Sequence, residues 1–503
     1  MDRPADLFDR SREWEQLAGF IAAHDQGLRV GVVSGRRRQG KSFLLRRLSR
    51  AAEGLYHQAQ EVERTQALER FADDVGRGLG LQAGQLRFAN WEIGLRTALG
   101  YPARGERILP GNNPAGPRRL LVIDELPYLL THSPEIPSVL QELFDEARDA
   151  SLPGACVVLC GSSLSIMTEL LSGAKPLRGR AQLDLMVLPF DYRTAAQYWG
   201  VTDPELAFRL HTVFGGTAGY RPLVDGAPAS MRRLDAWLAR NVLNPAHALY
   251  GEKDYLLRED SRIADKQLYN SILSAVAARN HTLTEIGSRV GRNRDALRHP
   301  VGVLEATGFL IKLDDMTNLR RSLYFLADPI VRFTEVVIEP YRHLLEEGAV
   351  AEVWQRAAPA VSTHILGPHF EHLTRVWTSR YSGDTWGGAQ LGQVGPGTVS
   401  DVAGRVQHEV DVVAVPLGAR ARDTTAPIVV LGESKSTNSQ RTLSDLVRLE
   451  RIRGLLAAKG RDAAGAHLAL FSRTGFDKDL IAAAKRRADV HLVTLADLYV
   501  DRG

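Results

Sequence analysis

The sequence predicts an α/β fold built on a parallel sheet, and three apolar runs lead to that prediction. Residues 30–33, 120–123 and 155–160 are continuous apolar segments of strand length. Strands that are buried on both faces, as in parallel sheets, have this composition. The first run leads into a glycine-rich segment, the second into two acidic residues and the third into Gly-Ser-Ser. We therefore expect a sheet whose carboxyl edge gathers polar groups.

Residues 35–42 read G-R-R-R-Q-G-K-S, which fits the phosphate-binding pattern G-x-x-x-x-G-K-[S/T]. An apolar run precedes the segment and an amphipathic run, residues 43–48, follows it, so the strand–loop–helix context is present. Backbone N–H groups of such a loop and the helix dipole favour a bound phosphate. We expect Lys41 to reach the β- and γ-phosphates of ATP and Ser42 to hold Mg²⁺. The alternative is a chance Gly-Lys-Ser turn before a helix.

Asp124 and Glu125 follow the second apolar run. We expect Asp124 to support the Mg²⁺ shell and Glu125 to orient or deprotonate the water that attacks the γ-phosphate. Ser162, after the third run, is expected near the γ-phosphate. The alternative is an ordinary sheet edge with polar strand ends. The full set expected to bind the nucleotide is Gly35, Arg38, Gln39, Gly40, Lys41, Ser42, Phe43, Asp124 and Ser162.

A basic loop, P-L-R-G-R, occupies residues 176–180. Arg178 or Arg180 could stabilise transition-state charge at the γ-phosphate, in its own subunit or in a neighbour's. A solvated basic loop is the alternative. Residues 101–118 are rich in Gly, Pro and Asn and predict an irregular loop. Residues 192–250 have a largely helical pattern, as expected for a lid, and Gly215-Gly216 interrupts it.

Length and composition indicate a cytoplasmic protein of about three domains. No apolar stretch approaches the ~20 residues that span a bilayer, and the N-terminus carries no signal-peptide core, so no membrane partner is expected. Cys156 and Cys160 lie four apart in a strand-like run, too far for a disulfide, which suits a reducing compartment. The net charge of +4 weakly favours an anionic partner.

Several of these segments together resemble the prokaryotic DEXX-box ATPase family, which is related to the AAA+ and STAND branches of P-loop ATPases. The resemblance covers about residues 5–250 and implies ATP binding and hydrolysis with Mg²⁺; a homo-oligomer is compatible with it. Ala218 stands where the family usually has the proline of Gly-Gly-x-Pro, a small departure. The matching segments are F-D-R at 8–10, the phosphate loop, I-D-E-L-P-Y at 123–128, G-S-S at 161–163 and P-L-R-G-R at 176–180.

Residues 256–345 resemble a winged helix-turn-helix, as the family implies. The pattern predicts helices over 269–277, from a Thr282 or Thr284 cap, and over 292–305, then a β-wing at 308–311 and 322–326. Pro300 should kink the third helix. Basic side chains on that helix and the wing could contact DNA phosphates, or the unit could serve as a protein-docking or intramolecular coupling module. These side chains are Arg292, Arg294, Arg298, His299, Arg320 and Arg321.

A second set of chemical groups lies in residues 346–503. Residues 408–415 and 428–435 predict paired strands, and side chains two apart on a strand share a face. Asp411, Glu433 and Lys435 can therefore meet, with Glu371 from a helix that begins near Gly367 and Glu409 as a fallback ligand. Asp411 and Glu433 suit Mg²⁺, or Mn²⁺, which can polarise a phosphodiester, and Lys435 would stabilise developing charge.

This pattern, E … D … E-x-K with flanking helices, resembles the PD-(D/E)XK nuclease superfamily over about residues 360–500. The predicted fold is thus a P-loop parallel-sheet ATPase with a helical lid (1–255), a winged helix-turn-helix (256–345) and a C-terminal α/β restriction-endonuclease-like domain (346–503). The expected function is an ATPase with metal-dependent nuclease action on nucleic acid, with DNA favoured. The alternative is a STAND-like nucleotide switch whose nuclease fold only binds.

Overall fold

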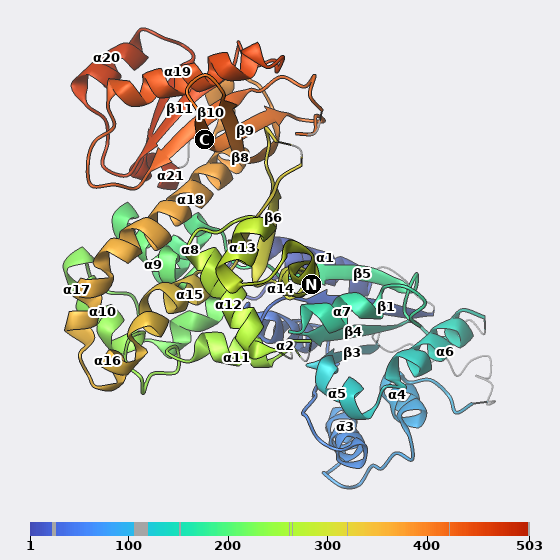
Figure 1. The fold of residues 1–503 in the computed structure, drawn as a ribbon. Helices are drawn as coiled ribbons and strands as arrows, with labels where there is room; N and C mark the ends of the chain where they lie inside the picture. Colours follow the sequence, from blue (N-terminus) through green and yellow to red (C-terminus); the bar gives the residue numbers. More distant parts are fainter. Residues whose placement is uncertain are drawn as a thin grey trace. The chain divides into compact units, whose positions relative to one another are not determined.

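The structure is a computed structural model that describes residues 1–22, 27–104, 119–149, 152–260, 262–263, 265–318, 320–421 and 423–500 (Figure 1). It divides into two compact units. The N-terminal unit comprises Met1–Pro189 and Thr217–Gly219, and the C-terminal unit comprises Phe190–Gly216 and Tyr220–Gly503. This grouping differs from the expected division at residues 255 and 345, which remains a prediction. Most of the expected loop at 101–118 lies outside the described residues.

Five parallel strands form the sheet of the N-terminal unit, in the order β2-β3-β4-β1-β5. The three strands predicted from apolar runs are confirmed, and β4 lies between β1 and β3. Since the strands are parallel, their carboxyl ends share one edge. The strands are β1 (Leu28–Ser34), β2 (Leu55–Gln58), β3 (Arg119–Asp124), β4 (Ala155–Gly161) and β5 (Ala181–Met186).

Both faces of this sheet are buried, because alternate residues of its strands enter two different hydrophobic cores. Leu121 and Ile123 of β3 belong to one core, while Leu120 and Val122 belong to the other. This accounts for the continuous apolar runs in the sequence. The helices of the unit are α1 (Ser11–Ala22), α2 (Lys41–Ala51), α3 (Arg64–Gly78), α4 (Trp91–Leu99), α5 (Leu126–His132), α6 (Ile136–Asp149) and α7 (Leu164–Leu170).

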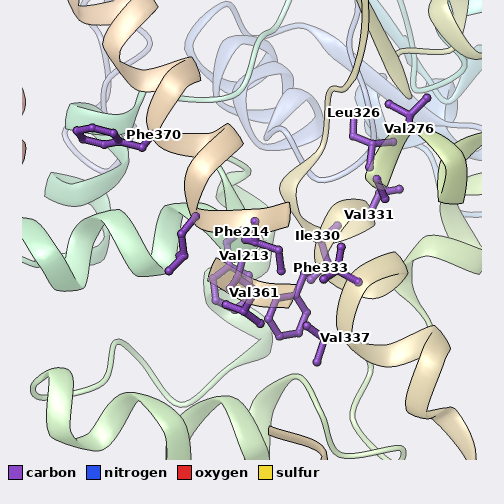
Figure 2. Close-up of a cluster of buried hydrophobic side chains, with 14 of the residues drawn as sticks. Val213, Phe214, Val276, Leu326, Ile330, Val331, Phe333, Val337, Val361 and Phe370 are labelled. Atoms are coloured by element: carbon purple, nitrogen blue, oxygen red, sulfur yellow. The ribbon is translucent and has the colours of Figure 1, made fainter. Parts of the chain in front are cut away.

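The C-terminal unit begins with helices that share one core with the segments after residue 265. Figure 2 shows part of this core, in which Val213 and Phe214 of α9 accompany Phe333 and Val361. The predicted lid helices therefore belong to this unit. The helices before the hairpin are α8 (Tyr192–Trp199), α9 (Pro204–Phe214), α10 (Met231–Asn241), α11 (Glu252–Arg258), α12 (Lys266–Ala277), α13 (Leu283–Val290) and α14 (Arg294–Ala306).

The hairpin β6 (Leu310–Asp314) and β7 (Ser322–Leu326) follows α14 and is antiparallel. The three predicted helices and the two predicted strands of this region are thus present. Thr282, one of the two expected cap residues, caps α13 through a reciprocal hydrogen-bond pair with Glu285. Further helices are α15 (Pro329–Phe333), α16 (Arg342–Glu346), α17 (Val350–Ala360) and α18 (Gly367–Arg380), with π-helical turns at Thr334–Ile338 and Val361–Leu366.

A five-stranded mixed sheet ends the chain, in the order β12-β11-β10-β9-β8. β8, β9 and β10 are antiparallel, whereas β10, β11 and β12 are parallel. In the described part of the chain, none of the helices has the length and apolar character needed to cross a membrane. The elements are β8 (Leu391–Asp401), β9 (Val406–Pro416), β10 (Val430–Lys435), α19 (Leu443–Ala458), β11 (His467–Ser472), α20 (Lys478–Lys485), β12 (Val490–Thr494) and α21 (Leu495–Tyr499).

Two histidines, His211 and His369, lie buried where α9 meets α18. His211 Nδ1 and His369 Nε2 are 2.8 Å apart, and the ring of His372, which is exposed, lies beside His369. Burial lowers the pKa of His211 to about 4, and it holds the pKa of His369 well below its ordinary value. Both buried histidines are therefore neutral in the folded protein at pH 7.

Acidification should destabilise the C-terminal unit through these histidines. In the unfolded chain these histidines take up protons below about pH 6.5. The free energy of unfolding is therefore at its full value above that pH and decreases as the pH falls towards 4. At pH 5 the loss is about 2 kcal/mol per histidine. Melting temperatures measured at pH 7 and pH 5 should differ less in His369→Gln than in the wild type. An equal difference in both proteins would contradict this, and the exposed His343→Gln serves as the control.

Candidate functional site

The phosphate-loop pattern lies between β1 and α2, as the sequence predicted. β1 ends at Ser34 and α2 begins at Lys41. Gly35 has a φ of +150°, and a Cβ at this position would lie 2.5 Å from the carbonyl oxygen of Val187. Gly40 has a φ of +88° and directly precedes the helix. Both glycines therefore occupy positions where a larger residue would be strained.

Three hydrogen bonds hold this loop, and two of them come from segments that are distant in sequence. The Lys41 ammonium donates to the carbonyl oxygen of Arg36 at 3.0 Å. Arg10 donates to the carbonyl oxygen of Gln39 at 3.1 Å, and the N–H of Gly219 donates to that of Arg38 at 2.7 Å. A Cβ on Gly219 would lie 2.7 Å from the Arg38 Cβ, so only glycine fits there. The sequence reading missed Arg10 as a residue that supports the loop.

Asp124, Glu125 and Ser162 meet at the carboxyl edge of the sheet. Asp124 ends β3 and is 0% exposed, and Glu125 follows with a φ of +57°. The Ser162 hydroxyl, just beyond β4, donates to Glu125 Oε2 at 3.3 Å. An uncommon backbone conformation at Glu125 is typical of residues held in place for function. The structure thus brings these three predicted residues to the edge at which the phosphate loop lies.

The donor set at this edge fits Mg²⁺. Hydroxyl and carboxylate oxygens are the ligands that Mg²⁺ prefers, and Ser42 and Asp124 supply them. Ser42 is half-buried in the first turn of α2. Phe43, the next residue, is 44% exposed, and the Arg47 guanidinium lies 4.5 Å from its ring centroid. Phe43 is therefore accessible beside the loop, as a residue that contacts a nucleotide would be.

Arg178 and Arg180 lie at the opposite edge of the sheet, so the expectation that either faces the γ-phosphate of its own subunit is wrong. They precede β5, which is parallel to β1, with Ala181 paired to Val30 and Met186 to Ser34. The length of that strand, about 17 Å, separates them from the phosphate loop. Arg180 donates to both carboxylate oxygens of Asp145 on α6, at 3.2 and 2.8 Å, and this bond lowers the Asp145 pKa. The sequence of a basic loop does not indicate at which end of the following strand the loop lies.

The third helix of the predicted winged unit presents an exposed basic face. Arg292, Arg294, Arg298 and His299 are exposed on or just before α14, although Arg298 also pairs with Asp295 at 2.9 Å. Arg320, on the hairpin, is exposed as well. Side chains in this arrangement can contact nucleic-acid phosphates.

The hairpin tip, however, is bound to β8 of the C-terminal sheet. The N–H of Met316 donates to Pro396 O at 2.8 Å, and the N–H of Thr398 donates to buried Asp315 at 3.1 Å. Arg321, predicted to contact DNA, instead donates to the Thr398 hydroxyl at 3.0 Å and lies 3.5 Å from Glu285. The prediction that Arg321 contacts DNA is therefore wrong, because its guanidinium is hydrogen bonded to β8 of the same chain.

Asp411 and Glu433 lie on adjacent strands, as predicted. Val412 of β9 pairs with Gly432 of β10, and the N–H of Ser434 donates to Asp411 Oδ2 at 2.7 Å. Glu433 is 2% exposed, and its Oε1 is contacted by Lys435 at 3.3 Å. Its Oε2 is buried without a hydrogen-bond partner in the described structure. Two arginines that the sequence reading did not single out also contact Oε1: Arg441 at 3.4 Å and Arg448 at 2.5 Å.

Glu371 approaches from α18 but is shared with the predicted winged unit. Arg279, between α12 and α13, lies 3.4 Å from Glu371 Oε1. Burial, then the charge of Glu371, raises the pKa of Asp411 to about 7. Glu371 and Asp411 are thus close enough to repel one another. Glu409, the fallback ligand, lies two residues before Asp411 on the same face of β9 and is exposed. Among the described residues, no three His, Cys, Asp or Glu side chains form a group that could hold a metal ion.

Comparisons with known proteins give distant similarities. No family model matches the chain. An uncharacterized protein of Methanocaldococcus jannaschii is 23% identical over 327 residues, which are 63% of this chain and 66% of that protein. A Walker-type ATPase of Pyrococcus abyssi is 20% identical, with 66% of this chain and 97% of that chain covered and a TM-score of 0.48. The ORC2 protein of Aeropyrum pernix is 16% identical, with 71% and 97% covered and a TM-score of 0.42.

If Arg180 acts at all on the γ-phosphate, it must do so in a neighbouring copy. Arg180→Ala should then slow ATP turnover by about 10³-fold or more while ATP binding persists. Mixing Arg180→Ala with Lys41→Ala should restore turnover, because one copy supplies the arginine and the other the nucleotide. If Asp145→Asn slows turnover as much as Arg180→Ala, the ion pair with α6 is the only role. Arg178→Ala tests the other candidate arginine in the same way, and Lys175→Ala is the control, since Lys175 is an exposed cation of the same loop that pairs with Glu169.

Proposed function

We propose that the chain binds and hydrolyses ATP in its N-terminal unit. The observation that supports this is the meeting of a phosphate loop, a buried aspartate and a Ser162–Glu125 hydrogen bond at one sheet edge. The N-terminus of α2 and the backbone N–H groups of the loop favour a bound phosphate. The paired acids at the end of β3 are the groups that Mg²⁺ coordination and water activation require.

The roles of the individual side chains follow from their positions. Lys41 would exchange its bond to the Arg36 carbonyl for the β- and γ-phosphates. Glu125 would orient the attacking water and accept its proton, with Ser162 fixing the carboxylate. Mg²⁺, when bound at Ser42 and Asp124, would neutralise phosphate charge. Thr217–Gly219, which joins the loop at Arg38, connects at both ends to the C-terminal unit.

Two substitutions test the ATPase proposal. Lys41→Ala should abolish tight ATP binding, because the phosphate charges lose their buried cation. Glu125→Gln should keep binding but reduce turnover by about 10²-fold or more, so that ATP is trapped. Fluorescent-nucleotide binding and phosphate release measure the two effects separately. Unchanged affinity in Lys41→Ala would show that the loop does not bind nucleotide.

We further propose that the C-terminal unit binds nucleic acid, with DNA favoured. The exposed basic face of α14 supports this, and the order of α12, α13, α14 and the β6–β7 hairpin is the order expected of a winged helix-turn-helix. Asp315 and Arg321 of the hairpin are hydrogen bonded to β8. These contacts support the second role expected of such a module, which is intramolecular coupling. Contacts to phosphate would then come from α14 and would weaken steeply with salt.

Metal-dependent cleavage by a PD-(D/E)XK-like site is a second candidate function. Two adjacent carboxylates, Asp411 and Glu433, support it, and the buried Oε2 of Glu433 offers a ligand atom without a hydrogen-bond partner. Mg²⁺ or Mn²⁺ held there would polarise a phosphodiester. The arginines on Glu433 Oε1 support instead the alternative of a fold that binds only, as in a STAND-like switch with slow ATP turnover.

Nicking of plasmid DNA with Mg²⁺ or Mn²⁺, with and without ATP, separates these alternatives. If the site cleaves, Asp411→Asn and Glu433→Gln should each abolish nicking and reduce Mn²⁺ binding measured by calorimetry, with ATP affinity unchanged. Asp479→Asn, an exposed acid on α20, is the control. Equal nicking in Asp411→Asn and wild type would leave the domain with a binding role alone.

A further inference from the structure

The carboxylate of Asp124 accepts a hydrogen bond on each of its two oxygens inside the N-terminal unit. The Tyr56 hydroxyl donates to its Oδ2 at 2.5 Å, and the N–H of Glu125 donates to its Oδ1 at 3.0 Å. Both donors are neutral, so the carboxylate is oriented while its negative charge remains available for a cation.

Strand register explains why these side chains meet. In the parallel pairing of β2 with β3, Tyr56 lies opposite Val122 and Gln58 opposite Asp124. Paired residues share a face of the sheet, so Tyr56 lies on the same face as Asp124, one pleat earlier along its strand. A tyrosine is long enough to place its hydroxyl at the end of β3 from that position, whereas shorter polar side chains are not.

Tyr56 remains a proton donor at neutral pH. An ordinary phenol has a pKa of about 10, so its hydroxyl keeps its proton at neutral pH. The hydroxyl therefore donates to Asp124 throughout the range in which the protein would bind nucleotide. A phenol fixes the rotation of a carboxylate in the way that outer-sphere hydrogen bonds orient metal ligands.

The ring of Tyr56 is itself oriented by the helix that follows the phosphate loop. Arg46 lies four residues after Ser42 on α2, and its guanidinium lies 5.3 Å from the Tyr56 ring centroid. The same guanidinium donates to Gln58 Oε1 at 2.5 Å, which ties it to β2. A chain of contacts thus runs from α2 through Arg46 and Tyr56 to Asp124.

We propose that Tyr56 is a positioning residue for the Mg²⁺ that accompanies ATP: it holds Asp124 in the rotamer that faces the ion. This rests on the proposed ATPase function and adds a residue that acts through Asp124 without touching the nucleotide. Outer-sphere partners of this kind change metal affinity by about 10- to 100-fold when removed. Tyr56 therefore sets the Mg²⁺ requirement of the site rather than its affinity for the nucleotide itself.

Tyr56→Phe tests this, because it removes only the hydroxyl. Binding of a fluorescent ADP analogue is measured first in EDTA and then across a Mg²⁺ titration. The half-saturating Mg²⁺ concentration should rise by about 10- to 100-fold, while affinity in EDTA stays at the wild-type value. At saturating Mg²⁺ the turnover number should return towards wild type, so the loss lies in the Mg²⁺ requirement.

Tyr101→Phe is the matched control. Tyr101 is a buried phenol of the same unit, and its hydroxyl has no hydrogen-bond partner in the described structure. Removing that hydroxyl should leave the Mg²⁺ titration unchanged. Arg46→Ala gives a second test that does not disturb the buried carboxylate, since Arg46 is exposed. It should raise the Mg²⁺ requirement in the same direction by a smaller factor.

Two outcomes would overturn the proposal. One is an unchanged Mg²⁺ titration in Tyr56→Phe or, if that variant does not fold, in Arg46→Ala. The other is a loss of nucleotide affinity that is equal in EDTA and in Mg²⁺, which would mean a structural role alone. Failure of the underlying ATPase proposal is distinguishable, because the wild-type protein would then bind no nucleotide in either condition.

Discussion

The direction of the strands in the N-terminal sheet decides which residues can cooperate. Five parallel strands place every carboxyl end at one edge, so the segments that follow β1, β3 and β4 converge. The phosphate loop, Asp124 and Ser162 belong to those segments, although they are far apart in sequence. The same rule places the residues before β5 at the other edge and separates Arg180 from the site. Register, rather than sequence spacing, therefore assigns roles in this unit.

In the C-terminal unit, the predicted DNA-binding module contacts one of the clustered acids and a strand of the C-terminal sheet. Arg279 pairs with Glu371, and the hairpin residue Thr317 donates to the carbonyl oxygen of Thr398 at 2.8 Å. A ligand that moved the module would change the electrostatic surroundings of Asp411, whose pKa depends on Glu371. The position of the module and the protonation of Asp411 are thus linked by short-range forces.

The sequence predicted local features well, because motif and periodicity report on neighbours along the chain. The bounds of the phosphate loop, the Thr282 cap and the pairing of the strands that carry Asp411 and Glu433 are of this kind. It missed Tyr56, Arg10 and Arg448, whose contacts depend on long-range packing that no local pattern encodes. Arg321 was misassigned for the same reason: its charge was visible in the sequence, but its neighbour on β8 was not.

The bound hairpin tip also protects the chain from self-association. β8 is the outermost strand of its sheet, and an exposed edge offers unpaired N–H and C=O groups to another molecule. The N–H of Met316 donates to the carbonyl oxygen of Pro396, and Asp315 accepts from the N–H of Thr398. Part of this edge is therefore already hydrogen bonded. Gly395 and Gly397 allow the approach, because a Cβ on either would lie within about 3.0 Å of the tip. If the hairpin tip left β8, the unpaired N–H and C=O groups of that strand could pair with another molecule. The tendency of the protein to aggregate therefore reports on the contact between the tip and β8.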